Sequence, residues 1–309
     1  MEEVVVGIDI GGTNTTIGLV SNSGRVLAKD GLRTRDYPKI ETFVIAATQV
    51  IKQQFENLRR EFPQLKLKGI GIGAPNANPR KGTIENAPNL SWHGIVPLAK
   101  LIYDEFHIPC KLTNDAKAAA LGEQNFGAAR GMKDFLVITL GTGLGSGIVS
   151  NGSLIYGFDG FAGELGHVIV VPDGRQCGCG RKGCLETYVS ATGLVNTYRE
   201  LNSSVEGEPD ARLIAEKAKE GDLTAIEAFR RTGEMLGFAL ANSVAYTSPE
   251  AIFLFGGLIR AGELLFKPTR ESFEKHLLNN YKGHIQIHPS ALHESDAAVL
   301  GAASIIWNE

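Results

Sequence analysis

The chain has 309 residues, enough for one large domain or two domains of ordinary size, each with its own hydrophobic core. Hydrophobic residues make up 43% and charged residues 21%, and the formal net charge of -3 gives no sign of a nucleic-acid or membrane partner. The acidic start M-E-E-V-V-V is unlike a signal peptide, and no apolar run approaches the length of a membrane-spanning helix. The sequence therefore predicts a cytoplasmic protein that acts on small molecules.

Apolar strands alternate with amphipathic helices along the chain, which is the pattern of an α/β protein. Each of the four clearest strands ends at a cluster of glycines; these strands are Val4–Ile10, Ile70–Ile72, Phe135–Leu140 and Ala251–Phe255. Helical periodicity is clearest in four further segments, namely Ile40–Phe62, Ala116–Phe126, Asp210–Glu220 and Leu223–Thr247.

Two glycine-rich segments resemble one another. V-V-V-G-I-D-I-G-G-T-N-T-T-I-G-L-V near the N-terminus and F-L-V-I-T-L-G-T-G-L-G-S-G-I-V in the middle each predict a strand, a Gly/Thr turn and a second strand. The repeat indicates two related halves, with a domain boundary just before Thr113 and a cleft between them. Chance similarity between two glycine-rich hairpins is the alternative.

The first of these turns carries a carboxylate. Asp9 precedes Gly11, Gly12 and Thr13, so it leaves the strand where bare backbone amides could receive a phosphate. One carboxylate at this place could hold the Mg²⁺ of a bound nucleotide. The spacing fits neither the Rossmann nor the P-loop motif, and a turn that needs glycine only for its geometry is the alternative.

Asn114 and Asp115 stand where a short apolar segment gives way to an alanine-rich helix. An Asn-Asp pair is common at a helix N-cap, and this structural role is one interpretation. The other is that Asp115 is a general base and that Asn114 orients a substrate hydroxyl beside it.

His167, Cys177, Cys179 and Cys184 lie within eighteen residues and form the ligand set of a closed tetrahedral zinc site. Unligated buried thiols are the alternative, whereas the sulfur spacing makes a disulfide framework improbable. Glu164 and Glu186 flank the cluster; a purely structural metal site would not need these polar groups, and a solvated charge beside the metal loop is the alternative for each.

Taken together, these motifs resemble the ROK family of bacterial sugar kinases and repressors, and the resemblance runs from residue 7 to about residue 303. The segments that carry it are D-I-G-G-T-N at 9–14, N-D at 114–115, L-G-T-G-L-G-S-G at 140–147, G-E-L-G-H at 163–167, C-G-C-G-R-K-G-C-L-E at 177–186 and F-G-G at 255–257. The zinc segment is the most specific of them, because similar glycine hairpins occur throughout the actin-like kinases.

The resemblance implies a role for each matching residue. Asp115 is expected to be the catalytic base, and Asp9 is expected to hold the Mg²⁺ that accompanies ATP. The expected ATP and phosphate ligands are Asp9, Gly11, Gly12, Thr13, Gly141, Thr142, Gly143, Gly256 and Gly257. The expected sugar ligands are Asn89, Asn114, Asp115, Glu164, His167 and Glu186, and His167 is also expected to bind a structural zinc with Cys177, Cys179 and Cys184.

The resemblance also implies an actin-like (ribonuclease H-like) α/β fold of two domains with an interdomain active-site cleft. The expected domains are residues 1–112 together with a C-terminal helix at about 297–309, and residues 113–296, which include the zinc loop 167–184. A homodimer or homotetramer is expected, because similar proteins commonly form them.

The function that follows is an ATP-dependent hexose kinase that phosphorylates the 6-hydroxyl of glucose. Fructose, mannose, N-acetylglucosamine and N-acetylmannosamine are alternative acceptors, since the named residues contact hydroxyls that many of these sugars share. A sugar-responsive transcription regulator is a distant alternative, because the strand at Val4 leaves no room ahead of it for a DNA-binding module.

Overall fold

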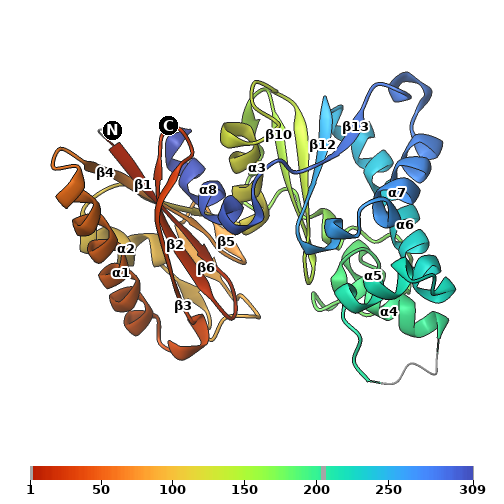
Figure 1. Ribbon diagram of the computed structural model, residues 1–309, viewed down its shortest axis with the longest axis horizontal. Helices are drawn as coiled ribbons and strands as arrows, with labels where there is room; N and C mark the ends of the chain where they lie inside the picture. The colour runs from red at the N-terminus through yellow and green to blue at the C-terminus, as the bar shows by residue number, and fades with distance from the viewer. Residues whose placement is uncertain (1–2, 203–206, 309) are drawn as a thin grey trace. The chain divides into compact units, whose positions relative to one another are not determined.

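Figure 1 shows the computed structural model of the protein, which describes residues 3–202 and 207–308 and, within these, the side chains of all but residues 294 and 295. The strands are β1 (Glu3–Ile10), β2 (Thr15–Ser21), β3 (Val26–Leu32), β4 (Lys66–Gly73), β5 (Ala77–Asn78), β6 (Thr83–Glu85), β7 (Ile95–Val96), β8 (Cys110–Thr113), β9 (Phe135–Leu140), β10 (Leu144–Ser150), β11 (Ser153–Leu154), β12 (Ala251–Phe255) and β13 (Gln286–Pro289). The α-helices are α1 (Ile40–Glu61), α2 (Leu98–Phe106), α3 (Asp115–Phe126), α4 (Ala191–Leu201), α5 (Ala211–Lys219), α6 (Leu223–Thr247), α7 (Glu263–His276) and α8 (Glu294–Trp307). The 3₁₀ helices are η1 (Thr34–Asp36), η2 (Leu165–His167), η3 (Leu185–Thr187), η4 (Gly257–Ala261) and η5 (Asn279–Tyr281).

The strands and helices expected from the sequence are all present, with ends that differ by a few residues at most. The largest difference is in β4, which extends well before Ile70 because its first residues pair with β1. Within the described residues, no helix has the combined length and apolar character needed to cross a bilayer.

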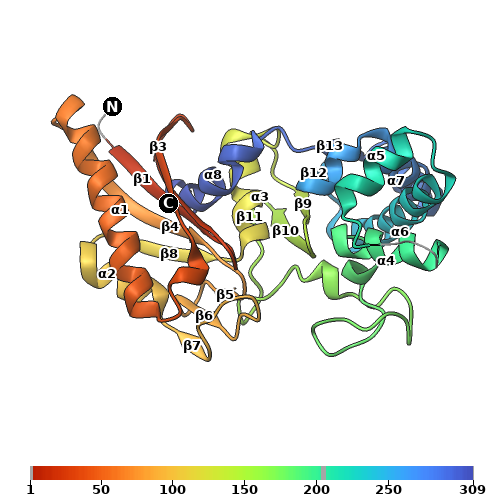
Figure 2. The ribbon, with the colours of Figure 1, turned by 60° about the horizontal axis from the view of Figure 1, so that its bottom comes forward.

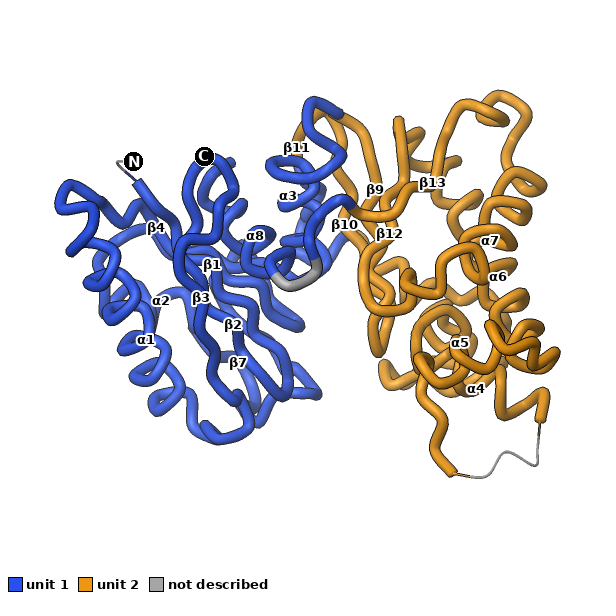
Figure 3. Tube along the Cα trace, in the orientation of Figure 1, with its two compact units in different colours: residues 1–132, 154–162, 291–309 blue, residues 133–153, 163–290 orange. Residues whose placement is uncertain are grey.

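The chain divides into two compact units, shown in two colours in Figure 3. Unit 1 contains Met1–Met132, Leu154–Ala162 and Ala291–Glu309, and unit 2 contains Lys133–Ser153 and Gly163–Ser290. The division differs from the expected boundary before Thr113, because helix α3 belongs to unit 1. Its packing explains why: a Cβ placed on Gly122 of α3 would lie 3.0 Å from the Cα of Gly301 in α8.

The sheet of unit 1 has the strand order β3-β2-β1-β4-β8. Strands β1 to β3 form antiparallel pairs, whereas β1, β4 and β8 run parallel. Helices α1 and α2 lie on one side of this sheet and α8 on the other (Figure 2). A smaller three-stranded sheet, β5-β6-β7, belongs to the same unit.

The alternation of side chains along β1 decides which face Asp9 occupies. Val4, Val6 and Ile8 are fully buried in the core on the α1 and α2 side. Gly7 points the other way, where an added Cβ would lie 2.1 Å from the carbonyl oxygen of Val299 in α8. Since residues two apart in a strand share a face, Asp9 lies on the α8 face beyond Gly7 and outside the apolar core.

Unit 2 repeats this arrangement. Its sheet has the order β11-β10-β9-β12-β13, in which the hairpin β9–β10 is antiparallel and β9, β12 and β13 run parallel. Helices α4 to α7 contribute to the core that covers one face of this sheet. Each unit therefore contains a hairpin followed by two parallel strands, as the predicted internal repeat requires.

Candidate active site and metal centre

Three neighbouring strands of unit 1 bring Asp9 and Asp115 to the same edge of the sheet. Asp9 near the end of β1 is paired in register with Gly73 at the end of β4, and Gly73 is paired with Thr113 at the end of β8. Asp115 follows directly, as the first residue of α3. Gly73 lies next to both residues: a Cβ added to it would be 3.7 Å from Oδ1 of Asp9 and 3.8 Å from the Cα of Asp115.

The surroundings of these two carboxyl groups favour their protonated forms. Desolvation, together with the nearby charge of Asp115, raises the pKa of Asp9 from 3.8 to about 7. Desolvation also raises the pKa of Asp115, whose side chain still reaches solvent. The hydrogen bond from the Ala116 N–H and the charge of Lys117 lower this pKa, but their effect is smaller. A carboxylate with a raised pKa is a stronger base, so Asp115 has the electrostatic setting that proton abstraction needs.

The start of α3 shows that the N-cap interpretation is also correct. Oδ1 of Asn114 accepts a hydrogen bond from the Ala116 N–H at 2.9 Å, and Oδ1 of Asp115 accepts from the same group at 2.8 Å. Capping uses only one oxygen of each side chain. The cap therefore does not need the amide nitrogen of Asn114 or the second oxygen of Asp115.

The first glycine turn lies beside Asn89. The turn is closed by a hydrogen bond of 2.9 Å from the Gly11 N–H to the carbonyl oxygen of Asn14. A Cβ on Gly12 would lie 2.6 Å from the carbonyl oxygen of Asn89, so only glycine permits this approach. Thr13 and Asn89 are both exposed at this turn.

The second glycine turn meets the F-G-G segment in unit 2. Strands β9 and β12 are parallel neighbours, so Gly141 to Gly143 after β9 and Gly256 and Gly257 after β12 emerge at the same edge of the sheet. Gly256 has a φ of +107°, and a Cβ there would lie 2.6 Å from the carbonyl oxygen of Leu140. Gly141, Thr142 and Gly257 are exposed, so their backbone groups can reach a ligand.

The predicted metal ligands come together in unit 2. One ligand atom from each of His167, Cys177, Cys179 and Cys184 can be chosen so that all four lie within 4.8 Å of one another. The loop is held by backbone hydrogen bonds from Val170 N to Gly183 O and from Leu185 N to Val168 O, both 2.9 Å long. The three cysteines of the cluster and Cys110 are all free thiols.

The spacing of these atoms fits a tetrahedral zinc ion. Zn–S bonds of about 2.3 Å and Zn–N bonds of about 2.0 Å place two ligands about 3.6–3.8 Å apart in a tetrahedron. Sγ of Cys179 lies 3.6 Å from Sγ of Cys184, and Sγ of Cys177 lies 3.7 Å from Nδ1 of His167. The cluster is therefore compatible with zinc, and Nδ1 is the histidine nitrogen that faces it.

Glu186 joins the metal cluster to the second glycine turn. Its Oε1 lies 3.0 Å from Sγ of Cys177 and 3.5 Å from Nδ1 of His167. Its Oε2 faces Gly143, where a Cβ would lie 2.8 Å away. Glu164 is exposed, and its backbone carbonyl accepts a hydrogen bond of 3.1 Å from the His167 N–H.

The structure thus groups the expected site residues within each unit. Unit 1 holds Asp9, Gly11, Gly12, Thr13, Asn89, Asn114 and Asp115. Unit 2 holds Gly141, Thr142, Gly143, Glu164, His167, Cys177, Cys179, Cys184, Glu186, Gly256 and Gly257.

Two residues of this region were not found from the sequence. Lys117 is buried, and its Nζ donates a hydrogen bond of 2.9 Å to the carbonyl oxygen of Gly160. A lysine among alanines, two residues after Asp115, is the signal that could have revealed it. Arg175 binds the segment around Glu186, and its contacts with backbone carbonyls left no signal in the sequence.

Comparisons with known proteins agree on one family. The family model described as ROK family matches residues 5–309. A glucokinase of Thermotoga maritima is 38% identical over 316 residues, which cover 98% of this chain and 96% of that protein. A xylose repressor of Caldicellulosiruptor bescii is 30% identical over 318 residues, which cover 99% of this chain and 78% of the repressor.

A solved structure matches at similar coverage. The crystal structure of a ROK family glucokinase from Streptomyces griseus, in complex with glucose and AMPPNP, is 33% identical, with a TM-score of 0.79. The match covers 98% of each chain.

Proposed function

The chain belongs to the ROK family and is a hexose kinase with the actin-like fold of that family, and we propose that it transfers the γ-phosphoryl group of ATP to the 6-hydroxyl of glucose. The observation that carries this proposal is the convergence of Asp9 and Asp115 on either side of Gly73. One carboxylate beside a glycine turn and a second one at a helix start supply the two acidic groups that phosphoryl transfer needs. A regulator that only senses sugar has no need for this pair.

In the proposed mechanism, Asp115 is the general base. Its free carboxylate oxygen accepts the proton of the attacking sugar hydroxyl, while Asn114 orients that hydroxyl through its amide nitrogen. Phosphoryl transfer depends on positioning and charge neutralisation more than on covalent help from the protein. The raised pKa of Asp115 makes the proton transfer more favourable.

The phosphates are held by both glycine turns in this proposal. Backbone N–H groups of Gly12, Thr13, Thr142 and Gly143 donate to the phosphate oxygens, and Gly256 and Gly257 lie beside the adenosine. Gly11 and Gly141 line the phosphate site, while their own N–H groups close the two turns. Asp9 would hold Mg²⁺, which neutralises phosphate charge when it is bound.

The sugar is held by polar side chains in this proposal. We assign hydroxyl contacts to Asn89, Asn114, Glu164, His167 and Glu186. Bound zinc would fix the loop that carries the last three, and His167 would offer Nε2 to the sugar because Nδ1 faces the sulfur atoms. Four protein ligands leave no open coordination position, so the metal role proposed here is structural.

Glucose is the proposed acceptor because the relatives named glucokinase are similar over nearly the whole chain. Fructose, mannose and the N-acetylhexosamines are the alternatives, since vicinal hydroxyls occur in all of them. A homodimer or homotetramer in the cytoplasm is also proposed from the family resemblance, and both stay predictions.

A coupled assay of ADP release over a panel of hexoses tests the acceptor. We expect the highest kcat/KM with glucose and none with 6-deoxyglucose, which lacks the nucleophile. If another hexose reacts and glucose does not, the assignment of the acceptor is wrong while the kinase assignment holds. Specific binding to sugar-operon promoter DNA without any turnover would favour a regulator instead.

A further inference from the structure

Arg175 contacts the segment that carries Glu186 from both sides. We propose that Arg175 is a positioning residue for sugar binding, which holds Cys184 and Glu186 in place without touching the substrate. The inference rests on the proposed function for its kinetic consequence, and on the contacts of the guanidinium for its structural basis.

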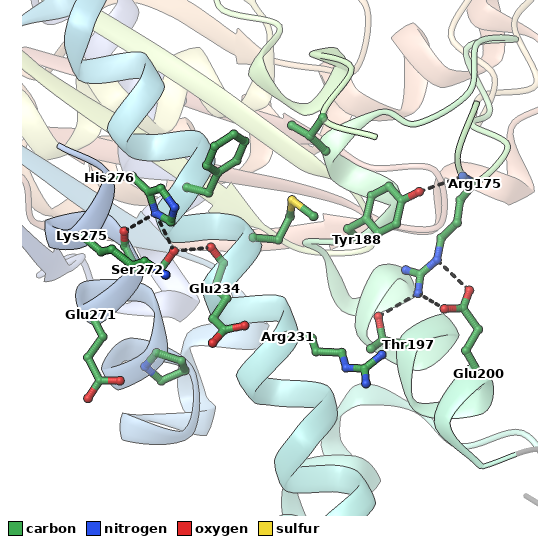
Figure 4. Close-up of a pocket in the computed structure, with 14 residues that line it drawn as sticks. Arg175, Tyr188, Thr197, Glu200, Arg231, Glu234, Glu271, Ser272, Lys275 and His276 are labelled. Carbon is green, nitrogen blue, oxygen red and sulfur yellow. Dashed lines mark hydrogen bonds and ion pairs between the residues drawn. The ribbon is translucent and has the colours of Figure 1, made fainter. Parts of the chain in front are cut away.

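The guanidinium of Arg175 is saturated with hydrogen-bond partners, as Figure 4 shows in part. Nε and Nη2 donate to the two carboxylate oxygens of Glu200 at 2.8 and 2.6 Å. Nη1 donates to the carbonyl oxygens of Thr187 and Gly193 at 2.6 and 3.2 Å, and Nη2 also donates to Oγ1 of Thr197 at 2.9 Å. Five N–H donors thus meet five acceptors, which is the full capacity of the group.

The aromatic ring beside it adds to this fixation. The guanidinium carbon lies 4.5 Å from the ring centroid of Tyr188, and only 15% of the Arg175 side chain is exposed. The hydroxyl of Tyr188 in turn accepts a hydrogen bond of 2.8 Å from the backbone N–H of Arg175. Both the main chain and the side chain of Arg175 are therefore fixed by the residues that follow Glu186.

These contacts enclose Cys184 and Glu186 on both sides. The Gly183 N–H donates to the carbonyl oxygen of Arg175 at 2.8 Å, just before Cys184. The guanidinium binds the carbonyl oxygen of Thr187, just after Glu186. One residue therefore fixes both ends of the short segment that carries a zinc ligand and a proposed sugar ligand.

The same segment leads on to the second glycine turn. Oγ of Ser190 donates to the carbonyl oxygen of Glu186 at 2.7 Å, and the Ala191 N–H donates to the carbonyl oxygen of Gly141 at 2.8 Å. Because Glu186 is itself a proposed sugar ligand, its shift after loss of Arg175 is expected to act first on the sugar. The ATP side has its own support from β9 and β12, so it is expected to change less.

Lysine cannot replace arginine in this role. Its ammonium group has three donors on a flexible stem and cannot serve five acceptors arranged around a plane. Arg175 and Arg231 line the same pocket, shown in Figure 4. Arg231 is the matched control, because it is half-exposed and its Nε donates to Glu227 at 2.8 Å. Arg231→Lys keeps this exposed ion pair possible and is expected to change little.

The test compares Arg175→Lys and Arg231→Lys in the full-length protein. We expect Arg175→Lys to raise the KM for glucose by about 10-fold or more, with a KM for ATP and a zinc content close to wild type. Hydrogen exchange of the amides of residues 183–188 should also become faster, and Arg231→Lys should change none of these quantities. Equal changes in both KM values, or an unchanged KM for glucose in a folded Arg175→Lys protein, would overturn the proposal.

A milder variant covers the case in which Arg175→Lys does not fold. The carboxylate of Glu200 is 60% exposed, so Glu200→Gln weakens the partner of Arg175 without touching the core. Glu200→Gln should raise the KM for glucose by a smaller factor. Glu234→Gln changes another carboxylate of the same pocket and should leave the KM for glucose unchanged. No effect of Glu200→Gln on either the KM for glucose or the exchange of residues 183–188 counts against the proposal.

The exchange measurement also separates this inference from the proposed function. If the wild-type protein phosphorylates no hexose, the proposed function fails. Faster exchange in Arg175→Lys would still support the positioning role of Arg175. If the wild type is active and the exchange of residues 183–188 is the same in Arg175→Lys, the positioning role of Arg175 is wrong and the kinase assignment stands.

Discussion

At the scale of single residues, Asp9 and Asp115 are held where a negative charge is costly. Register across β1, β4 and β8 places them at one sheet edge, and Gly73 between them leaves their approach free of side chains. Burial and mutual repulsion raise the pKa of Asp9 to about 7. Such a site suits a protein that binds a cation and abstracts a proton, because both functions need carboxylates that are short of other partners.

The pH dependence of activity follows from this electrostatics. Both carboxylates must be ionised to act, so kcat/KM should fall as the pH decreases through about 7, the pKa of Asp9, rather than through the ordinary carboxyl range. Raising the Mg²⁺ concentration should move this fall to lower pH, because the cation favours ionised Asp9. A pH profile that stays flat down to about 4 would contradict the assignment.

The same shift predicts an effect on stability, with a sign that can be checked. Because the folded-state pKa of Asp9 lies above 3.8, its contribution to stability is complete below that pH and is lost as the pH rises through about 7. Asp9→Asn should therefore melt at a higher temperature than wild type at pH 8, and the difference should be smaller at pH 5. An equal difference in melting temperature at the two pH values would show that the folded state does not disfavour the ionised form of Asp9.

At the scale of elements, the segment from η2 to η3 carries all four residues of the predicted metal site. His167 enters from η2, Cys184 precedes η3, and Glu186 lies within η3. Cys177 and Cys184 are buried, whereas Cys179 is exposed. Zinc bound to these ligands, together with the contacts of Arg175, would hold Glu186 in one position on an irregular segment.

Removal of one zinc ligand tests this coupling. Cys179→Ser should lower the zinc content, measured by mass spectrometry, and should raise the dissociation constant for glucose by about 10- to 100-fold. Cys110→Ala is the control, since Cys110 lies on β8 outside the cluster, and it should keep both values. Loss of zinc without any change in glucose affinity would separate the metal from the sugar site.

At the scale of the whole molecule, the sequence predicted the internal repeat because each half carries its own local signals. The two hairpins are visible as apolar runs on either side of Gly/Thr turns, and their pairing is confirmed in β1–β2 and β9–β10. The clustering of His167, Cys177, Cys179 and Cys184 was predictable for the same reason, since the four residues lie close together in the sequence.

Features that depend on contacts between residues far apart in the chain could not be predicted from the sequence. The division into compact units differs from the boundary expected before Thr113, because α3 packs in unit 1 through Gly122 against Gly301, residues far apart in the chain. The role of Arg175 was missed because its partners include the carbonyl oxygens of Thr187 and Gly193, which every residue type possesses. Lys117 was missed because burial of a lysine depends on an acceptor, Gly160, that only the fold supplies.

The central claim, that this chain transfers a phosphoryl group to a sugar with Asp115 as the base, is tested most directly by Asp115→Asn. The variant keeps a side-chain oxygen for the Ala116 N–H, so α3 should remain capped and the fold intact. We predict that ADP release with glucose falls by about 10²- to 10⁴-fold, while the dissociation constant for glucose, measured by calorimetry, changes only a few-fold. Turnover close to that of the wild type would contradict the account.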